Sequence, residues 1–589
     1  MRKIVNGLFI ITCTVSLVFA GDFVQTGVAP PYIDGADTLF GGVPGSASRG
    51  ALVGTDLDQD GLREVWVTSY SNGGQVFCFE EAGTDTLAFV WAAAEITADY
   101  SSPRDVHTGD LDSDGKGEII FHVGRWTGES NPDAGLHVYE WDGINDNGYG
   151  TEAAFRVDFM NALNDSLAES RVEGFSVGDI DGDGQDEILL ANNGTSDPVW
   201  GTQDGSTPYS NDRFIIMSVS GDIGGFGATI VEEYSMSPRD VDKDGVRENA
   251  LGGGSPQDII ICDTDGDGNL EAACFSWNNL AVFFIEATGP DAYTIGDTTY
   301  RKLGISDDWT LGASAADNDG DGKDEVYVTG YYDGSLFVIT DSDDDATSLD
   351  QTGGPGDWTG NSEIAIIHEF GGGGGFGTST GAGPTNSGMG GVIHGGTAGV
   401  SDINLFELAA GGNPLDSLSW THSSYALDDA TSGWSFKAKA WFPGTGNADY
   451  VGVLLPYQAV NDTLDSGELD PAGNRVFRLA EWDESVTVRD ITFIMPEDYK
   501  LAQNFPNPFN ATTRIEYRLP LQNTISLTIY NMLGQEIVKL VDTEYQRAGN
   551  YSVLWNGKDA NGMNVTSGMY IYALKFGNFE KSKQMMLLK

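Results

Sequence analysis

Five short acidic runs in this chain have the residue types and the spacing of a divalent-cation site. Each run reads D-x-D-x-D-G-x-x-E, and the runs begin at Asp56, Asp110, Asp179, Asp263 and Asp317. Four carboxylates so close in sequence repel one another, and a cation between them relieves that repulsion. Oxygen ligands at alternating positions, with a glycine where the loop turns sharply, are typical of Ca²⁺ sites. The pattern therefore predicts five calcium loops.

Every loop offers the same five ligand positions. Positions 1, 3, 5 and 9 would bind through carboxylate oxygens, and position 7 through its backbone carbonyl, so that its side chain can vary. The predicted ligands are Asp56, Asp58, Asp60, Leu62 and Glu64; Asp110, Asp112, Asp114, Lys116 and Glu118; Asp179, Asp181, Asp183, Gln185 and Glu187; Asp263, Asp265, Asp267, Asn269 and Glu271; and Asp317, Asp319, Asp321, Lys323 and Glu325. A sixth run of the same form, Asp240, Asp242, Asp244 and Glu248, is not followed by a strand pattern, and whether it holds a metal stays open.

Two other interpretations of the loops are less favoured. An EF-hand needs a bidentate glutamate at position 12 and a helix on each side, whereas the last carboxylate here is at position 9. The residues that follow the loops are β-branched and aromatic, as in Glu64–Thr68 and Glu325–Thr329, so each loop is expected to join two strands. A solvated acidic turn without metal would account for one such run more easily than for five in matching strand contexts.

The composition indicates a large, acidic, exported protein. The chain has 589 residues, 79 glycines and a formal charge of −57, which disfavours nucleic acid and anionic membranes as partners. Residues 1–20 have the basic, apolar and small-residue regions of a secretory signal peptide, and no later segment resembles a transmembrane helix. Cys262 and Cys274 flank the fourth loop, so a disulfide between them is one alternative and two thiols the other, while Cys78 is expected in the core.

The spacing of the loops predicts a repeated sheet. The intervals between loop starts are 54, 69, 84 and 54 residues, and about fifty residues is the length of a propeller blade. Two weaker copies, at 402–411 and 447–455, bring the expected number of blades to seven over residues 21–495. Residues 21–50 are expected to supply a strand that closes the ring. The glycine-rich insertion at 371–399 is expected to be a flexible excursion between the fifth and sixth blades.

The last ninety residues differ from the rest in composition. Nine basic and six acidic residues lie in 501–589, so this segment is slightly basic whereas the body is strongly acidic. Strand patterns with period 2 occur at 514–519, 525–530, 551–555 and 569–574, with Asn556-Gly557 and Asn561-Gly562 as turn signals. Residues 496–589 are therefore expected to form a small antiparallel β-sandwich.

Both parts of the chain resemble known families. The loops, their spacing and their strand context resemble the FG-GAP or VCBS repeats of calcium-binding β-propellers, such as the head of integrin α chains. This resemblance implies Ca²⁺ at Asp56, Asp58, Asp60, Glu64 and their counterparts, and it implies little about the ligand. The C-terminal segment resembles the immunoglobulin-like sorting domain of type IX secretion cargo. The matching residues are Asn504–Asn510, Ile529–Gln535, Gly549–Tyr551, Trp555–Asp559, Ser567–Tyr570 and Met586–Lys589.

The sorting-domain resemblance implies export across two membranes by the type IX machinery, followed by release or attachment at the cell surface. No nucleophile elbow, H-E-x-x-H motif or paired-cysteine zinc pattern is present. The six histidines, at positions 107, 122, 137, 368, 394 and 422, are scattered and are expected to pack in the core or at the rim. A surface module that binds glycan or protein is favoured. A polysaccharide-active enzyme, such as a lyase with Ca²⁺ near a basic residue, and a passive surface protein stay open.

Overall fold

The computed structural model describes the chain in runs that contain its strands and the five acidic loops. The described residues are 22–28, 48–69, 75–83, 86–94, 96, 103–124, 131, 133–158, 170–193, 213–225, 227–236, 256–276, 281–295, 301–302, 310–330, 335–340, 363–370, 380–384, 390–395, 402–426, 434–435, 439–441, 452–458, 477–483, 492–494, 498–520, 523–576 and 579–588. Their elements are β-strands and a short 3₁₀ turn, η2 (Ser417–Ser419), which confirms the all-β class. No helix among them is long and apolar enough to cross a membrane. The predicted signal peptide lies outside the described residues.

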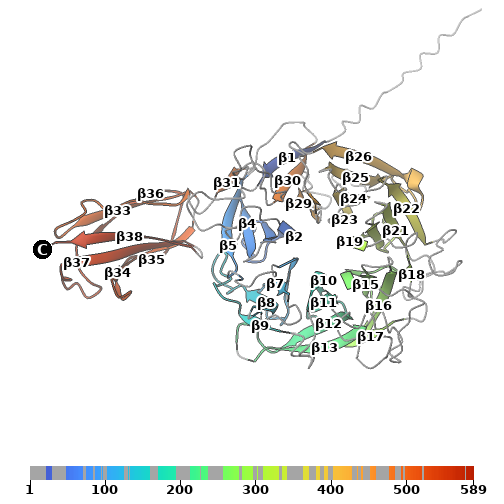
Figure 1. The fold of residues 1–589 in the computed structure, drawn as a ribbon, viewed down its shortest axis with the longest axis horizontal. Coiled ribbons are helices and arrows are strands. Elements are labelled where there is room, and N and C mark those ends of the chain that lie inside the picture. Colours follow the sequence, from blue (N-terminus) through green and yellow to red (C-terminus); the bar gives the residue numbers. More distant parts are fainter. Residues whose placement is uncertain are drawn as a thin grey trace, which may run out of the picture.

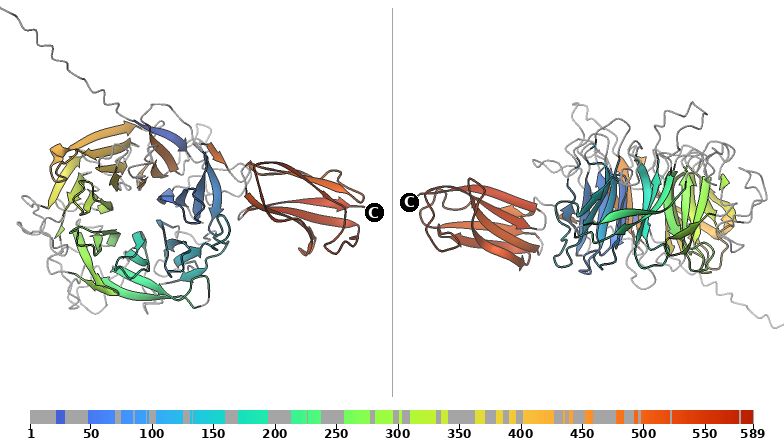
Figure 2. Two further views of the ribbon diagram at one scale, coloured as in Figure 1. Left: turned by 180° about the vertical axis from the view of Figure 1, so that it is seen from behind. Right: turned by 90° about the horizontal axis from the view of Figure 1, so that it is seen from below.

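β-Sheets stand side by side around a ring, and a separate pair of sheets extends from one edge of it (Figure 1). Seen from the side, the strands of the ring run through its thickness from one face to the other (Figure 2). Each of the first five sheets carries one acidic loop, and its antiparallel strands follow chain order. The sheets therefore repeat along the chain at the spacing of the acidic loops.

These five sheets are built from consecutive strands of the chain. The first sheet has β2 (Ser48–Thr55), β3 (Glu64–Ser69), β4 (Val76–Gly83) and β5 (Thr86–Ala92); the second has β6 (Val106–Gly109), β7 (Glu118–Val123), β8 (Gly135–Glu140) and β9 (Phe155–Val157); the third has β10 (Val172–Gly178), β11 (Glu187–Asn192), β12 (Arg213–Ser220) and β13 (Thr229–Met236); the fourth has β14 (Pro256–Cys262), β15 (Glu271–Ser276), β16 (Ala281–Gly289) and β17 (Ala292–Thr294); the fifth has β19 (Thr310–Ala316), β20 (Glu325–Gly330), β21 (Ser335–Ile339) and β22 (Ile364–Glu369). A further short strand, β18 (Arg301–Lys302), pairs with β16.

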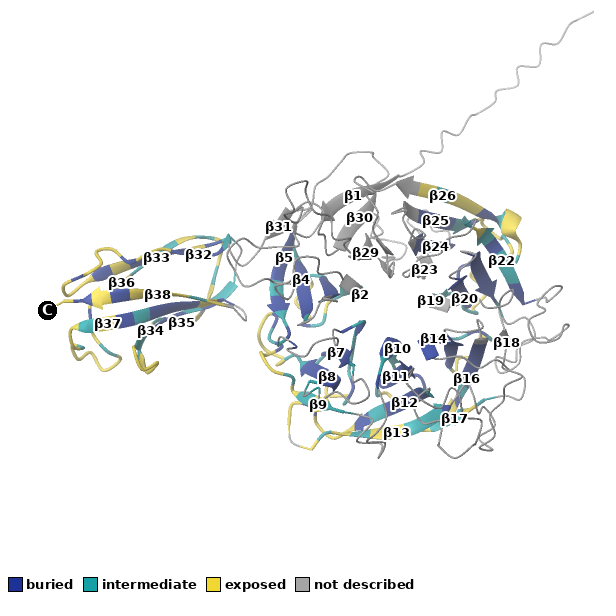
Figure 3. Cartoon of the chain, in the orientation of Figure 1, coloured by how far each residue is buried: buried dark blue, intermediate teal, exposed yellow. Residues whose placement is uncertain are grey.

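The cores lie between neighbouring sheets, so a sheet interior is covered on both faces (Figure 3). All six residues of β7, β11, β15 and β20 are buried. Between the first and second sheets, Trp66, Trp91, Tyr139 and Tyr149 pack edge to face, with ring centroids 4.9–6.0 Å apart. Removal of these large rings from water is a main source of stability at this interface.

The sixth sheet corrects the prediction of a flexible glycine-rich excursion. It consists of β23 (Thr380–Pro384), β24 (Gly390–Gly395), β25 (Asp402–Leu408) and β26 (Trp420–Ala426), so its first two strands come from residues 371–399. Val392 and Ile393 of β24 are fully buried and pair with Phe406 and Leu405 of β25. The segment from Asp402, which was expected to be a weaker copy of the acidic loop, is therefore the third strand of this sheet.

The last sheet of the ring joins the two ends of the ring-forming chain. It contains β1 (Asp22–Val28), β27 (Trp434–Ser435), β28 (Lys439–Trp441), β29 (Gly452–Gln458) and β30 (Phe477–Asp483). β1 pairs antiparallel with β30, from Asp22 opposite Asp483 to Val28 opposite Arg478. The predicted closing strand is thus confirmed. Beyond it, β31 (Thr492–Ile494) pairs in parallel with β5 of the first sheet.

The C-terminal residues form two facing sheets, as predicted. One contains β32 (Lys500–Leu501), β33 (Thr513–Leu519) and β36 (Gly549–Trp555), and the other contains β34 (Asn523–Asn531), β35 (Glu536–Gln546), β37 (Gly568–Phe576) and β38 (Phe579–Leu587). In β33 buried and exposed residues alternate strictly, because one face meets the core and the other meets water. Gly557 and Gly562, in the predicted turns, have φ of 67° and 75°.

The three cysteines of the described residues, Cys78, Cys262 and Cys274, are buried thiols, and the alternative of a disulfide between Cys262 and Cys274 is wrong. Cys262 faces the core shared with the fifth sheet, whereas Cys274 faces the core shared with the third. The register places Cys274 opposite Ile259 and Cys262 opposite Glu271, so the two side chains lie on different faces of the fourth sheet.

Candidate metal centres

Each acidic loop connects the first strand of its sheet to the second, as predicted. The glycines at position 6 have positive φ, between 83° and 95°, which side chains with a Cβ rarely adopt. They are Gly61, Gly115, Gly184, Gly268 and Gly322. The loops thus have the sharp turn that the glycine predicted. Strands lie on both sides of each loop, whereas an EF-hand loop lies between two helices.

Backbone N–H groups of the loop point at the carboxylates and hold them in place. In the second loop, Gly115 N donates to Asp110 Oδ2 at 3.0 Å, and Lys116 N donates to Asp114 Oδ1 at 2.8 Å. The N–H at position 7 donates to the aspartate at position 5 in all five loops, over 2.6–2.9 Å. Both oxygens of Asp110 accept loop N–H groups, and a carboxylate oxygen that accepts one hydrogen bond still has a lone pair for another partner.

The glutamate at position 9 is the buried ligand candidate of each loop. Glu64, Glu118, Glu187, Glu271 and Glu325 are between 0% and 3% exposed. In every loop this carboxylate accepts the N–H of position 2, over 2.6–3.1 Å. The other oxygen has no hydrogen-bond partner in three loops: Glu64 Oε2, Glu118 Oε1 and Glu271 Oε1. A buried, half-satisfied carboxylate is costly unless a cation or a proton joins it.

Electrostatics supports the same conclusion. Burial, reinforced by the neighbouring aspartates, raises the pKa of Glu64 to about 7 and that of Glu325 to about 8. Burial likewise raises the pKa of Glu118 and Glu187 to about 9 and shifts that of Glu271 upward. Without a metal, burial therefore favours the protonated form of these side chains, and a divalent cation would displace those protons.

The structure brings carboxylates of the loops together as the spacing predicted. In the second loop, one oxygen each of Asp110, Asp112, Asp114 and Glu118 lies within 4.8 Å of the others. The same holds for Asp56, Asp58 and Glu64 in the first loop and for Asp179, Asp181 and Glu187 in the third. Oxygens on opposite sides of Ca²⁺ are about 5 Å apart, so these groups fit that ion. The sixth run, Asp240–Glu248, lies outside the described residues.

The aspartate at position 3 also contacts the next sheet, which sequence reasoning missed. Its Oδ2 accepts a backbone N–H from the outer turn of the following sheet in three cases, over 2.6–2.7 Å. The pairs are Asn147 N with Asp58, Ile223 N with Asp112, and Asp291 N with Asp181. The position-3 aspartates of the first three loops are thus positioned partly by residues 89 to 111 positions away in sequence.

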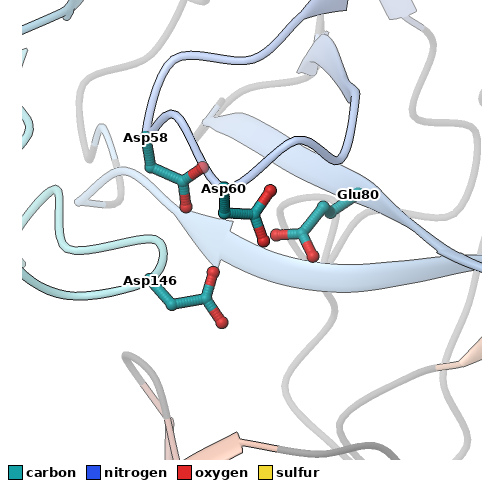
Figure 4. A group of neighbouring side chains, drawn as sticks. All are labelled: Asp58, Asp60, Glu80 and Asp146. Atoms are coloured by element: carbon teal, nitrogen blue, oxygen red, sulfur yellow. The ribbon is translucent and has the colours of Figure 1, made fainter.

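Further carboxylates outside the loops were also missed. Asp60 groups with Asp58, Glu80 and Asp146, and Asp112 groups with Glu140 and Asp222 (Figure 4 shows the first group). Glu80 lies opposite Glu64 in the pairing of β3 and β4, and Glu140 lies opposite Glu118 in that of β7 and β8. An acidic residue on the third strand, opposite the loop glutamate, was the available sequence signal.

Lys116 is the basic side chain at the second loop. Its Nζ donates to Asp114 and, at 2.9 Å, to Glu140 Oε1. These hydrogen bonds raise the pKa of the Lys116 ammonium, so it stays charged at neutral pH. A lyase base must lose a proton before it can accept one, and Lys116 does not fit that role.

The histidines are less scattered than the sequence suggested. His368 of β22, His394 of β24 and His422 of β26 gather around Phe370 and Phe406, and the rings of His368 and His422 are 4.3 Å apart. Burial lowers the pKa of both His368 and His422. In the second sheet, His122 contacts Ser170 Oγ at 3.2 Å, and His137 contacts the Asp133 carbonyl at 2.7 Å. The first group makes ring contacts and the second makes hydrogen bonds, as expected of histidines in the core or at the rim.

Comparisons with known proteins agree with the loops and the tail. The family model of the FG-GAP-like repeat matches residues 56–121, and that of the secretion system C-terminal sorting domain matches residues 503–588. No curated protein matches the chain.

Solved structures give distant similarities. The periplasmic gluconolactonase PpgL of Pseudomonas aeruginosa is 12% identical with a TM-score of 0.37, covering 69% of this chain and 96% of that one. The BP39L lectin of Burkholderia pseudomallei is 11% identical with a TM-score of 0.39, covering 77% and 100%. PorZ, a surface component of the type IX secretion system of Porphyromonas gingivalis, is 13% identical with a TM-score of 0.21, covering 92% and 82%. These similarities are too distant to inform ligand or activity. The two family matches and the geometry together show that this chain contains an FG-GAP-like repeat region and a C-terminal Por sorting domain of the type IX secretion system.

Proposed function

We propose that this protein is a secreted or surface-attached calcium-binding β-propeller that binds glycan or protein ligands. The signal peptide at 1–20 and the sorting domain at 496–589 would direct its export through the type IX machinery. Residues 21–495 would form a seven-bladed propeller, and the tail an immunoglobulin-like sandwich. The consecutive four-stranded sheets and the closing pair β1–β30 support the propeller.

The repeated loop geometry carries the calcium assignment. In all five loops the position-9 glutamate is buried and accepts the same backbone N–H, and in three of them its second oxygen has no hydrogen-bond partner. The donors are oxygens only, which suits a hard cation such as Ca²⁺ better than Zn²⁺ or Cu²⁺. The aspartates at positions 1, 3 and 5, the glutamate and the carbonyl at position 7 would hold the ion. Calcium would supply charge balance and fix the bend between two strands.

A binding module is favoured over an enzyme by the state of Lys116. Lys116 is held as a cation by Asp114 and Glu140, and Arg63 of the first loop pairs with Glu81. A rigid ring with fixed loops is a scaffold on which rim residues can present a binding surface.

Two measurements on the exported, full-length protein test the proposal. Elemental analysis after dialysis against micromolar free Ca²⁺ and then against millimolar Ca²⁺ should show about five loop-bound ions at the higher concentration, and a metal-free protein would refute the calcium assignment. A glycan array, run with Ca²⁺ and with EDTA, should show calcium-dependent binding without turnover. Release of unsaturated products from uronic-acid polymers would favour the lyase instead.

A further inference from the structure

Four carboxylates meet at the interface between the first and second sheets. Asp58 and Asp60 come from the first loop, Glu80 from β4, and Asp146 from the turn between β8 and β9 (Figure 4). One oxygen of each lies within 4.8 Å of the others. Three separate segments of the chain therefore converge on one point, and Glu80 and Asp146 belong to no loop motif.

Asn147 keeps these carboxylates in place. Its backbone N–H donates to Asp58 Oδ2 at 2.7 Å, and its side-chain amide donates to Glu80 Oε2 and, at 3.2 Å, to Asp146 Oδ1. Asp58 is 5% exposed, yet its Oδ1 has no hydrogen-bond partner. A buried carboxylate oxygen without a donor, in a group with three more carboxylates, is costly unless a cation or a proton joins the group.

No lysine or arginine of the described residues forms an ion pair with Asp58, Asp60, Glu80 or Asp146. The interface between the second and third sheets shows how the same arrangement is neutralised by a side chain. There, Asp112, Glu140 and Asp222 occupy the corresponding places, and Lys116 Nζ lies 2.9 Å from Glu140 Oε1. The residue at the position of Lys116 in the first loop is Leu62, which brings no charge.

We infer that Asp58, Asp60, Glu80 and Asp146 form a second class of cation site, which binds a divalent ion such as Ca²⁺ between two blades and is separate from the ion of the first loop. Asp58 and Asp60 would serve both ions, with Asp56 and Glu64 on one side and Glu80 and Asp146 on the other. The ion balances the carboxylates here as the Lys116 ammonium does at the interface between the second and third sheets. It also links the first loop to the outer turn of the second sheet.

The test compares Asp146→Asn with Asp222→Asn in the full-length protein, with Ca²⁺ as the probe. Both residues are exposed aspartates in equivalent turns, outside all loop motifs. Bound calcium is counted by elemental analysis after equilibrium dialysis, and circular dichroism monitors the fold. D146N should bind one ion fewer than the wild type, whereas D222N should bind the same number because Lys116 already balances its cluster. An unchanged count in D146N would overturn the inference.

Two more variants separate this site from the loop site. Glu64→Gln removes the buried ligand of the first loop, so the double variant E64Q/D146N should lose two ions. A loss of only one ion would mean that the first loop and the inter-blade carboxylates hold a single shared ion, and it would overturn the inference. Leu62→Lys should lose the same single ion as D146N, and a full count in L62K would count against the inference. If E64Q and Glu118→Gln keep the wild-type count while D146N loses one ion, the proposed loop sites fail and the inter-blade site stands.

Discussion

Replacement of Glu118 by glutamine tests how protons and calcium share the second loop. Glu118 is fully buried, its Oε2 accepts the Leu111 N–H at 2.6 Å, and its Oε1 has no partner. A glutamine has the same shape, its amide oxygen can accept the Leu111 N–H, and its NH₂ can donate to nearby aspartates. The variant therefore removes the titrating charge and keeps the packing.

The size of the expected change in the free energy of unfolding follows from the raised pKa of Glu118. Burial raises the pKa of Glu118 to about 9, whereas an unfolded glutamate has a pKa of about 4.3. The metal-free protein takes up a proton at this site when it folds, so its stability is highest below the unfolded pKa and falls as the pH rises toward the folded pKa. Within that window one group changes the free energy of unfolding by about 1.4 kcal/mol per pH unit, or about 2.7 kcal/mol between pH 6 and pH 8.

Urea unfolding of wild type and E118Q at these two pH values, in EDTA and in saturating Ca²⁺, gives the readout. In EDTA the wild type should lose about 2.7 kcal/mol more than the variant between pH 6 and pH 8, because glutamine does not titrate. In calcium this excess should vanish, since the bound ion keeps Glu118 ionised in the folded state. The same pH dependence for both proteins in EDTA would refute the linkage between burial, protonation and metal binding at this site.

Three further predictions concern the whole chain. If each loop binds Ca²⁺ with a dissociation constant of about 10⁻⁴ to 10⁻³ M, five sites add about 2 to 7 kcal/mol at roughly 1 mM calcium, so EDTA should lower the calorimetric transition of the ring and leave that of the sandwich unchanged. An unmoved ring transition would contradict this. Asn504→Ala removes buried hydrogen bonds to Thr513 Oγ1 at 2.9 Å and to the Pro506 carbonyl at 3.1 Å, and should cost the sandwich about 1–3 kcal/mol without changing calcium binding. In a thiol titration of the unfolded, unreduced protein, Cys78, Cys262 and Cys274 should all react, and reaction of Cys78 alone would reveal a disulfide.

The loops could be predicted because everything that shapes them is local in sequence. The glycine at position 6 and the glutamate at position 9 belong to one nine-residue loop. The N–H groups of positions 2 and 7, which donate to the carboxylates at positions 9 and 5, belong to the same loop. The strand patterns around them were equally clear, since the strand that follows each loop begins at the glutamate itself, as β7 does at Glu118.

The sixth sheet shows why composition alone misled. Residues 371–399 contain four large apolar side chains, Phe376, Met389, Val392 and Ile393, and so many glycines predict an irregular segment. β24 nevertheless pairs along its length with β25, whose Leu405 and Phe406 supply the apolar cover. At one of these glycines, Gly390, a Cβ would lie 2.3 Å from the Asn318 carbonyl oxygen of the fifth sheet, which requires a residue without a side chain. This glycine therefore allows the two sheets to approach each other closely, and it is not a sign of flexibility.

The contacts between sheets could not be predicted from the loop motif, because their partners are far apart in sequence. Asp58 and Asn147 are 89 residues apart, and Asp181 and Asp291 are 110 apart. These hydrogen bonds use one oxygen of an aspartate whose other oxygen faces the loop or the inter-sheet carboxylates. An ion that fixes this aspartate therefore also fixes the outer turn of the next sheet. Removal of calcium should loosen the interfaces between sheets before the strands within a sheet separate, so amide exchange in EDTA should rise first at Asn147, Ile223 and Asp291 and later in the buried strands β7 and β11.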